Sequence, residues 1–286
     1  MKTFTSVDVE NYYDQTEVHY RMFWKFEQAK GLHYGVWDKS SKSLNEAILN
    51  TNFLLMKLGE IKPDNLVLDC GCGIGGSAIY LAKKLGCKVS GVTLSQKQAN
   101  IATAFAKKEG VDHLVSFCQK NYLETGFSDN SFDIIWAIES FSSSTDKELF
   151  FKEMQRILRP GGKILFADYF KPSPYNIDAD ADMQTMLNGW AISDILSIDE
   201  LKKLAGENNF KVVKISDVTK NVKKSVSLIF WAAILGMFGT KIYNLFKKAS
   251  YFSRIHYRTG IAQRKAYNKG KWGYYLVVCE SNKSNE

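Results

Sequence analysis

The chain has 286 residues, 45% of them hydrophobic and 24% charged, a composition that excludes a disordered chain and suffices for one large domain with a cap. Its five scattered cysteines and an N-terminus without a signal-like pattern predict a reduced, cytoplasmic protein without a disulfide framework. The longest apolar run, 225–239, is interrupted by Gly236 and is shorter than the roughly 18 residues of a membrane-spanning helix.

The N-terminal part, residues 1–50, is rich in aromatic side chains and is predicted to form a helical cap. Residues 51–220 alternate short β-branched runs with amphipathic stretches, which is typical of a parallel sheet flanked by helices. Residues 221–270 are helical, apolar first and then basic, and we interpret them as a lid before a last strand in 271–286. Strands are predicted at 66–70, 88–92, 115–118, 132–138 and 163–169, from 211, and at 272–279.

The expected fold is therefore α/β: a seven-stranded, mostly parallel, doubly wound (Rossmann-like) sheet with a helical N-terminal cap and an inserted helical lid. Capping-box spacing predicts helix starts at Ser95, Thr145 and Ser197. Arg159-Pro160-Gly161-Gly162 is predicted to be a turn before the fifth strand, because proline presets φ and paired glycines permit a reversal.

The first predicted strand leads into a glycine-rich turn, V-L-D-C-G-C-G-I-G-G, and then into a helix. Gly71 and Gly73 permit positive φ and let a ligand approach the backbone closely, and the helix behind them offers unpaired N–H groups. Cys70 and Cys72 are only one residue apart, which is not the spacing of a zinc half-site, so no metal is expected.

The acidic residues around this turn indicate the charge of its ligand. A dinucleotide site needs an acidic residue at the end of the second strand to hold the ribose, and Thr93 stands there instead. Asp69, two residues before the first glycine, would oppose a pyrophosphate. It would favour a ligand with an ammonium or sulfonium group.

Four motifs in chain order resemble those of class I methyltransferases that use S-adenosylmethionine: D-C-G-C-G-I-G-G, G-V-T-L-S-x-x-Q, F-S-D-N-S-F-D-I-I-W and R-I-L-R-P-G-G-K-I. Within that superfamily, five further motifs resemble those of the sterol- and tocopherol-type small-molecule enzymes: Y-Y-D, H-Y-G-V-W, V-T-L-S-Q-K-Q, W-A-I-E-S and W-G-Y. The resemblance implies methyl transfer from S-adenosylmethionine, leaving S-adenosylhomocysteine, to an apolar small molecule. Isoprenoid, sterol-like, prenylated and aromatic acceptors are all compatible with it, with methylation at carbon or oxygen.

The same resemblance assigns cofactor contacts residue by residue. It implies that the methionine part lies on the backbone at Gly71 and Gly73, with Asp69 near its ammonium group. Thr93 and Gln98 would share the ribose. Asn121 would accept a hydrogen bond from the adenine amine in place of the usual Asp. Leu94, Tyr122 and Ile138 complete the expected cofactor-binding set.

Two residues are candidates for a catalytic base. Glu139 ends the fourth predicted strand, where ligands gather in a doubly wound sheet, although it could also be structural. His33 lies between Gly31 and Gly35 in a segment able to close over a ligand, although it could instead pack the lid. The histidine of sterol-type relatives would fall at Ser143 and is missing here. An aromatic set could line the acceptor pocket or form the core of the cap: Tyr12, Tyr13, Tyr20, Trp24, His33, Tyr34 and Trp37. Tyr12 is expected to complete the catalytic set with Glu139 and His33.

The net charge of +8 is unevenly distributed. Residues 202–286 contain 17 Lys and Arg against 4 Asp and Glu, which gives +13 and leaves −5 for the rest. This excess either covers a solvated surface or faces a lipid head group or a phosphate-bearing substrate. Nucleic acid is not expected as a partner, because no compact basic run and no RNA-binding signature is present.

The lid segment 225–248 is predicted to touch substrate or a membrane surface, with a helix buried between cap and sheet as the alternative. Its one-sided apolar positions are Leu228, Ile229, Trp231, Ala232, Leu235 and Phe238, and its flanking lysines are Lys220, Lys223, Lys224, Lys241, Lys247 and Lys248. Two other functions stay open: a nicotinamide- or nucleotide-binding oxidoreductase on the same sheet, and a membrane-surface binding module. The sequence does not indicate the oligomeric state.

Overall fold

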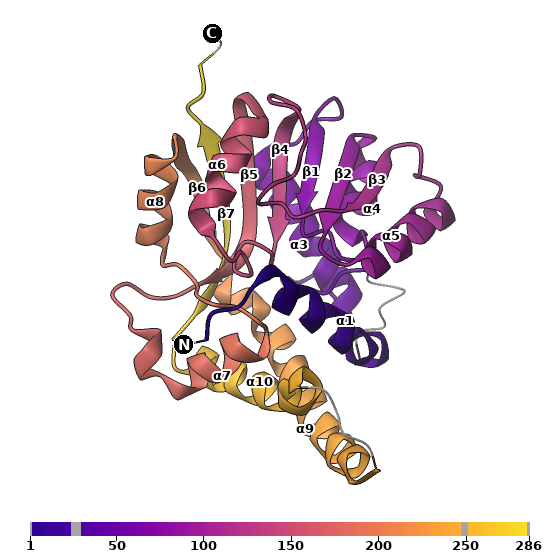
Figure 1. Cartoon of the computed structure of the whole chain (residues 1–286), viewed down its shortest axis with the longest axis vertical. Coiled ribbons are helices and arrows are strands. Elements are labelled where there is room, and N and C mark those ends of the chain that lie inside the picture. Colours follow the sequence, from indigo (N-terminus) through magenta and orange to yellow (C-terminus); the bar gives the residue numbers. More distant parts are fainter. Residues whose placement is uncertain (1, 24–29, 247–250, 285–286) are drawn as a thin grey trace.

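A single seven-stranded sheet forms the centre of the computed structural model, which describes residues 2–23, 30–246 and 251–284 (Figure 1). Its order is β3-β2-β1-β4-β5-β7-β6, with β7 antiparallel to β5 and β6 and the other neighbours parallel. The predicted seven-stranded, mostly parallel sheet is confirmed. The strands are β1 (Leu66–Cys70), β2 (Lys88–Thr93), β3 (Val115–Gln119), β4 (Phe132–Ile138), β5 (Leu158–Phe170), β6 (Phe210–Asp217) and β7 (Gly273–Ser281).

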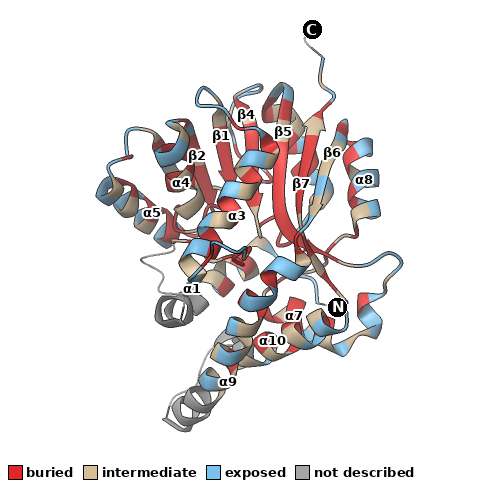
Figure 2. Ribbon diagram, turned by 180° about the vertical axis from the view of Figure 1, so that it is seen from behind, coloured by how far each residue is buried: buried red, intermediate tan, exposed pale blue. Residues whose placement is uncertain are grey.

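Helices cover both faces of this sheet, because successive strand residues point to opposite sides. Val67 of β1 packs in a core shared with helices α3 (Leu44–Gly59) and α4 (Gly76–Leu85). Leu68, its neighbour, packs in a second core with α6 (Lys147–Ile157) and α8 (Ile198–Glu207). Helix α5 (Gln96–Glu109) connects β2 to β3. Figure 2 shows the central strands in red, buried between these layers, whereas the edge strand β6 is mostly exposed or intermediate.

Further helices gather at one end of the sheet (Figure 1). They are α1 (Ser6–Phe23), α7 (Ala181–Gly189), α9 (Lys223–Phe246) and α10 (Tyr251–Asn268), with the short 3-10 helices η1 (Ile177–Ala179) and η2 (Thr219–Val222). Helices α9 and α10 lie between β6 and β7 in the chain, where the lid was predicted. The predicted boundary at residue 50 falls inside α3, and the division of the chain into parts stays a prediction. Among the described residues, no helix combines the length and hydropathy that a membrane crossing requires.

Two of the three predicted helix starts are confirmed. The Ser95 hydroxyl accepts a hydrogen bond from the N–H of Gln98, and Ser197 forms a complete capping box with Glu200. The prediction of Thr145 is wrong, because the side chain of Asp146 accepts from the N–H of Leu149 and starts α6 one residue later. Asp is the stronger capping residue of the two.

The turn predicted at Arg159–Gly162 is also wrong as a separate element. Strand β5 already begins at Leu158, which pairs with Phe132 of β4. Pairing continues at Lys163 opposite Ile134 after a register shift, and Gly161 in between has a φ of +68°. The glycines therefore form a bulge within the strand, which keeps β5 in the sheet.

Candidate functional site

The glycine turn after β1 is packed against the loop that follows β4. Gly71 has a φ of +78°, and a Cβ added there would lie 2.6 Å from the Cβ of Ser140. Gly73 has a φ of +52°, but a Cβ added there would meet no described atom within 4 Å. The first glycine is therefore required for packing, whereas the second leaves open space beside the backbone, as a ligand cradle needs.

Asp69, near the end of β1, places a buried carboxylate under this turn. Burial raises the pKa of Asp69 to about 7, and a hydrogen bond from the N–H of Ala78 in α4 opposes that rise. Within the described ranges, its Oδ2 has no hydrogen-bond partner, and neither has the buried Oγ of Ser140 beside Gly71. A buried polar atom without a partner costs about 1–3 kcal/mol, so a ligand that donates to Oδ2 would stabilise this site.

The tip of β2 holds the pair predicted to bind the ribose. Thr93 and Gln98 are both buried, and the hydroxyl of Thr93 donates to Oε1 of Gln98 at 2.7 Å. Next to them, the hydroxyl of Ser95 donates to Oδ1 of Asp14 in α1, also at 2.7 Å. Asp14 was not among the residues predicted for this site. Only the packing of α1 brings this carboxylate to the strand tip where Thr93 replaces the usual acid.

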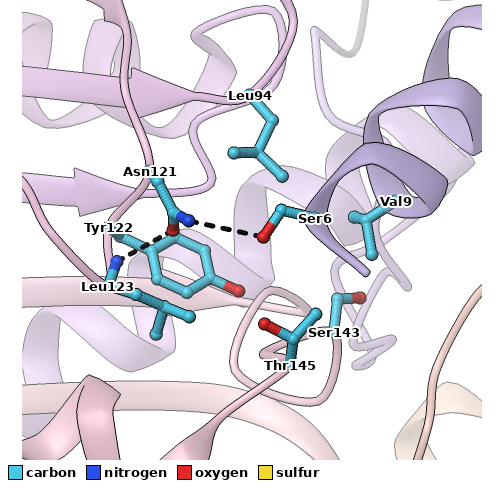
Figure 3. Close-up of a pocket in the computed structure, with 8 residues that line it drawn as sticks. All are labelled: Ser6, Val9, Leu94, Asn121, Tyr122, Leu123, Ser143 and Thr145. Carbon is cyan, nitrogen blue, oxygen red and sulfur yellow. Dashed lines mark hydrogen bonds between the residues drawn. The ribbon is translucent and has the colours of Figure 1, made fainter. Parts of the chain in front are cut away.

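A pocket of about 180 Å³ lies between the start of α1 and the tips of β2 and β3 (Figure 3). Among its lining residues are three of the predicted cofactor residues, Leu94, Asn121 and Tyr122. The amide of Asn121 donates to the Ser6 hydroxyl at 3.3 Å, and its oxygen accepts from the N–H of Leu123 at 2.9 Å. An amide oxygen has two lone pairs, so Asn121 can accept one further hydrogen bond.

Glu139 directly follows β4 and is held in an uncommon conformation, with a φ of +48°. Such a conformation costs of order 1–3 kcal/mol and is concentrated at functional sites. The carboxylate accepts hydrogen bonds from the N–H of Tyr34 at 2.6 Å, from the hydroxyl of Tyr274 at 2.8 Å, and from the hydroxyl of Tyr169. Desolvation raises the pKa of Glu139 to about 8, although these three donors oppose the rise.

Five aromatic side chains pack beside this carboxylate and are called here the aromatic cluster: Tyr34, Tyr169, Trp190, Trp272 and Tyr274. Neighbouring ring centroids are 5.4–6.4 Å apart, within the range of favourable aromatic pairs. The hydroxyl of Tyr34 also donates to the buried side chain of Gln263 in α10 at 2.5 Å. Aromatic faces together with a carboxylate suit an apolar or cationic group.

His33 lies next to this cluster in the chain and is buried. Its Nδ1 is 2.9 Å from the carbonyl oxygen of Tyr34, a contact that makes Nδ1 the protonated nitrogen. Desolvation lowers the pKa of His33 to about 4, so the ring is neutral at pH 7. Its Nε2 has no hydrogen-bond partner in the part of the chain that the structure describes.

The remaining predicted residues lie at the margins of the site. Tyr12 is buried on α1 in a small apolar cluster with Phe4, Val9 and Ala191, which Leu94 also touches. Ile138 is the last residue of β4 and pairs with Ala167 of β5. Of the predicted aromatic set, Trp24 lies outside the described residues, as does the side chain of Tyr20.

These residues fit the cofactor that the sequence suggested. An ammonium group would supply the donor that Asp69 Oδ2 lacks, and the open face of Gly73 would let the ligand approach the turn. Thr93, Gln98 and Asn121 offer polar groups along the same edge of the sheet. Helix α1 forms one wall of the pocket through Ser6 and Val9.

Comparison with known proteins gives related sequences as well as a shared fold. A family model described as a methyltransferase domain matches residues 68–166. The chain is 32% identical over 197 residues to the 27-O-demethylrifamycin SV methyltransferase of Amycolatopsis mediterranei (strain S699), covering 68% of this chain and 72% of that protein. It is 33% identical over 166 residues to the sarcosine/dimethylglycine N-methyltransferase of Halorhodospira halochloris, covering 58% and 56%.

A solved structure adds a match over the whole fold. The geranyl diphosphate C-methyltransferase of Streptomyces coelicolor A3(2), in complex with Mg²⁺, geranyl diphosphate and S-adenosyl-L-homocysteine, aligns with a TM-score of 0.74. The alignment covers 98% of this chain and 100% of that one at 20% identity, so it shows a common fold alone.

Proposed function

Because the chain belongs to the class I S-adenosylmethionine-dependent methyltransferases, we propose that it methylates an apolar small molecule held beside Glu139 and the aromatic cluster. Its cofactor is S-adenosylmethionine, and the reaction leaves S-adenosylhomocysteine. This membership decides between the methyltransferase and oxidoreductase functions that the sequence left open. The three proteins compared above carry O-demethyl, N-methyl and C-methyl in their names, so relationship alone does not fix the acceptor atom.

The surroundings of Glu139 are the main support for an apolar acceptor. The N–H of Tyr34 and the hydroxyls of Tyr169 and Tyr274 already donate to its carboxylate, so the groups that otherwise surround Glu139 are mainly aromatic rings. A small, highly charged acceptor would need more buried polar partners than this cluster supplies. The acceptor is therefore best matched by a molecule with an apolar body and a single reacting group near Glu139.

Methyl transfer requires little covalent chemistry from the protein. The sulfonium of the cofactor supplies an activated methyl group, and the enzyme contributes proximity and alignment for an in-line displacement. Asp69 and the open face of Gly73 would hold the methionine part, and Thr93 with Gln98 the ribose. Glu139 would orient the acceptor and take its proton where the acceptor atom carries one.

The two candidate bases differ in their fitness for proton uptake. Glu139 has a pKa raised to about 8, within about one unit of a working pH near 7, so it can exchange a proton there, and the deprotonated fraction that acts as a base grows as the pH rises through 8. The pKa of His33 is lowered to about 4, so it holds a proton poorly at pH 7. We therefore assign the base to Glu139. His33 would accept a hydrogen bond through Nε2 and thereby position the segment that covers the site.

Asp69 makes cofactor binding depend on pH. Since its pKa is raised to about 7, the carboxylate is protonated below that pH and cannot pair with the ligand's ammonium group. We expect the affinity for S-adenosylhomocysteine to fall about tenfold for each pH unit below 7 and to level off above pH 8. Calorimetric titration from pH 5.5 to 8.5 measures this dependence.

Asp69→Asn should bind S-adenosylhomocysteine weakly, with an affinity that no longer depends on pH. Asp64→Asn removes an exposed carboxylate before β1 and should keep the pH dependence of the wild type. A wild-type affinity that stays constant between pH 5.5 and 8.5 would remove Asp69 from the ligand's ammonium group.

Methyl transfer to a panel of acceptors tests the proposed function. The protein is incubated with S-adenosylmethionine labelled in its methyl group and with a sterol, a prenylated phenol, an aromatic polyketide or sarcosine. We expect the label to enter the organic extract with at least one of the first three compounds. Transfer to sarcosine alone would contradict the apolar acceptor.

A further inference from the structure

Helix α9 presents an apolar stripe to solvent. Leu228, Trp231 and Leu235 are 42%, 58% and 67% exposed, and their spacing of three and four residues places them on one face of the helix. Figure 2 shows this helix extending away from the sheet with exposed residues along it. Single exposed apolar residues are ordinary, but a row of large ones marks a contact surface. Of the other predicted stripe positions, Ile229 packs against Ile48, and the side chain of Phe238 is not described.

The opposite face of α9 is fixed to the protein, so the stripe cannot turn inward. The buried hydroxyl of Ser225 accepts hydrogen bonds from the N–H of Gly35 at 3.1 Å and from the indole N–H of Trp37 at 3.0 Å. The carbonyl of Val226 accepts from the side chain of Gln263 in α10 at 2.9 Å. The rotation of α9 about its axis is therefore determined by these contacts, and the fold leaves Leu228, Trp231 and Leu235 outside.

The chain segment that contains α9 carries only positive charges. Residues 218–279 contain 12 Lys and Arg and no Asp or Glu. Lys220 and Lys223 are exposed where α9 begins, and the ammonium of Lys224 lies 4.8 Å from the ring centre of Trp37. Lys224 lies four residues before Leu228 and therefore on the same face of α9, so a partner that covers the stripe meets a cation there, which favours an anionic partner.

We propose that this face of α9 docks on an anionic lipid surface, with Leu228, Trp231 and Leu235 entering the head-group boundary and the neighbouring lysines meeting lipid phosphates. An amphipathic helix binds a bilayer through large apolar and indole side chains on one face and basic residues beside them. Nucleic acid would use the charge but leave two leucines without a partner. The docking does not depend on the proposed acceptor.

The position of α9 connects this surface with the site. Its inner face holds Gly35 through Ser225, and Gln263 links Val226 to the hydroxyl of Tyr34. Tyr34 in turn belongs to the aromatic cluster and donates its N–H to Glu139. Contacts of α9 and α10 thus connect the lipid surface with the residues proposed to hold the acceptor, and docking would bring an apolar molecule in the lipid close to them. This consequence rests on the proposed function.

Vesicle flotation tests the docking. We expect the wild-type protein to float with vesicles of phosphatidylcholine and phosphatidylserine, much less with phosphatidylcholine alone, and less at high salt. Leu228→Ser should weaken binding by about tenfold or more, as the loss of one buried leucine implies. Leu149→Ser on α6 is the matched control, because Leu149 is 43% exposed and Leu228 is 42% exposed, and it should bind as wild type.

The charge is tested by a double reversal, Lys220→Glu with Lys223→Glu, which should reduce binding to anionic vesicles at least tenfold, since each lysine contributes about fivefold. The same reversal at Lys107 and Lys108, exposed at the end of α5, is its control. Equal flotation of wild type and Leu228→Ser, or equal binding to neutral and anionic vesicles, would overturn the proposal. So would a dimer in light scattering that Leu228→Ser dissociates without any effect on vesicles, because the stripe would then bind a second copy.

Titration with S-adenosylhomocysteine accompanies each variant. Unchanged affinity shows that the variant is folded. Vesicle binding can then fail while methyl transfer succeeds, or the reverse, so the two proposals are tested separately.

Discussion

Gly73→Val is expected to reduce the affinity for S-adenosylhomocysteine by about 10- to 100-fold or more, the effect of forcing a side chain into a close-packed contact. The reason is the open space at this position: no described atom lies within 4 Å of an added Cβ, so the new side chain occupies the place where the ligand approaches the backbone. Calorimetric titration gives the affinity, and urea unfolding gives the free energy of unfolding of the same sample.

The matched control is Gly110→Val. Gly110 also has a positive φ, +71°, and also has open space around an added Cβ, but it caps the far end of α5. Both substitutions cost roughly 1–2 kcal/mol of backbone strain, so their stability losses should be similar. Gly110→Val should keep the wild-type affinity. A folded Gly73→Val protein with unchanged affinity would show that the ligand does not approach the turn at Gly73.

Glu139→Gln is expected to lower the turnover number by about 10²- to 10⁴-fold, the range of a positioned acid–base group. Glutamine keeps the shape and still accepts hydrogen bonds from Tyr34 and Tyr274, but it cannot carry charge or take a proton. The affinity for S-adenosylhomocysteine and the unfolding free energy should change little. Single-turnover measurement with saturating acceptor separates the chemical step from binding.

Glu153→Gln supplies the comparison. Glu153 is buried, accepts hydrogen bonds from the N–H and hydroxyl of Thr125, and is paired with Arg156, so its loss should reduce stability. Because it lies on α6 away from Glu139, the folded variant should turn over as wild type. Equal turnover of Glu139→Gln and wild type would remove Glu139 from the chemistry and leave it a structural role.

The sheet could be predicted from local patterns because each strand has its own signal. The β-branched runs and the glycine turn lie within short windows, and the seven strands were found in that way. The exact ends of helices and strands depend instead on competition between adjacent residues. Asp146 replaces Thr145 as the cap of α6, and the bulge at Gly161 keeps β5 paired where the sequence predicts a turn. Both outcomes follow from competition between adjacent residues, which spacing alone does not decide.

The residues of the candidate site also fall into those that local motifs predict and those that they do not. Asp69, Gly73 and Thr93 could be predicted because they lie in short motifs at strand ends. The surroundings of Glu139 could not, because Tyr169 is 30 residues away in the chain and Tyr274 is 135 residues away. Only the placement of β7 beside β5 brings Tyr274 to this carboxylate. Asp14 likewise reaches Ser95 only through the packing of α1 on the sheet.

A crystal structure of the protein with S-adenosylhomocysteine would show directly whether the cofactor lies between Asp69 and Glu139. We expect the ligand's amino group to donate to Oδ2 of Asp69, its ribose to meet Thr93 and Gln98, and its sulfur to face Glu139 and the aromatic cluster. A ligand whose carboxylate lies at Asp69, or whose sulfur points away from Glu139, would contradict this arrangement.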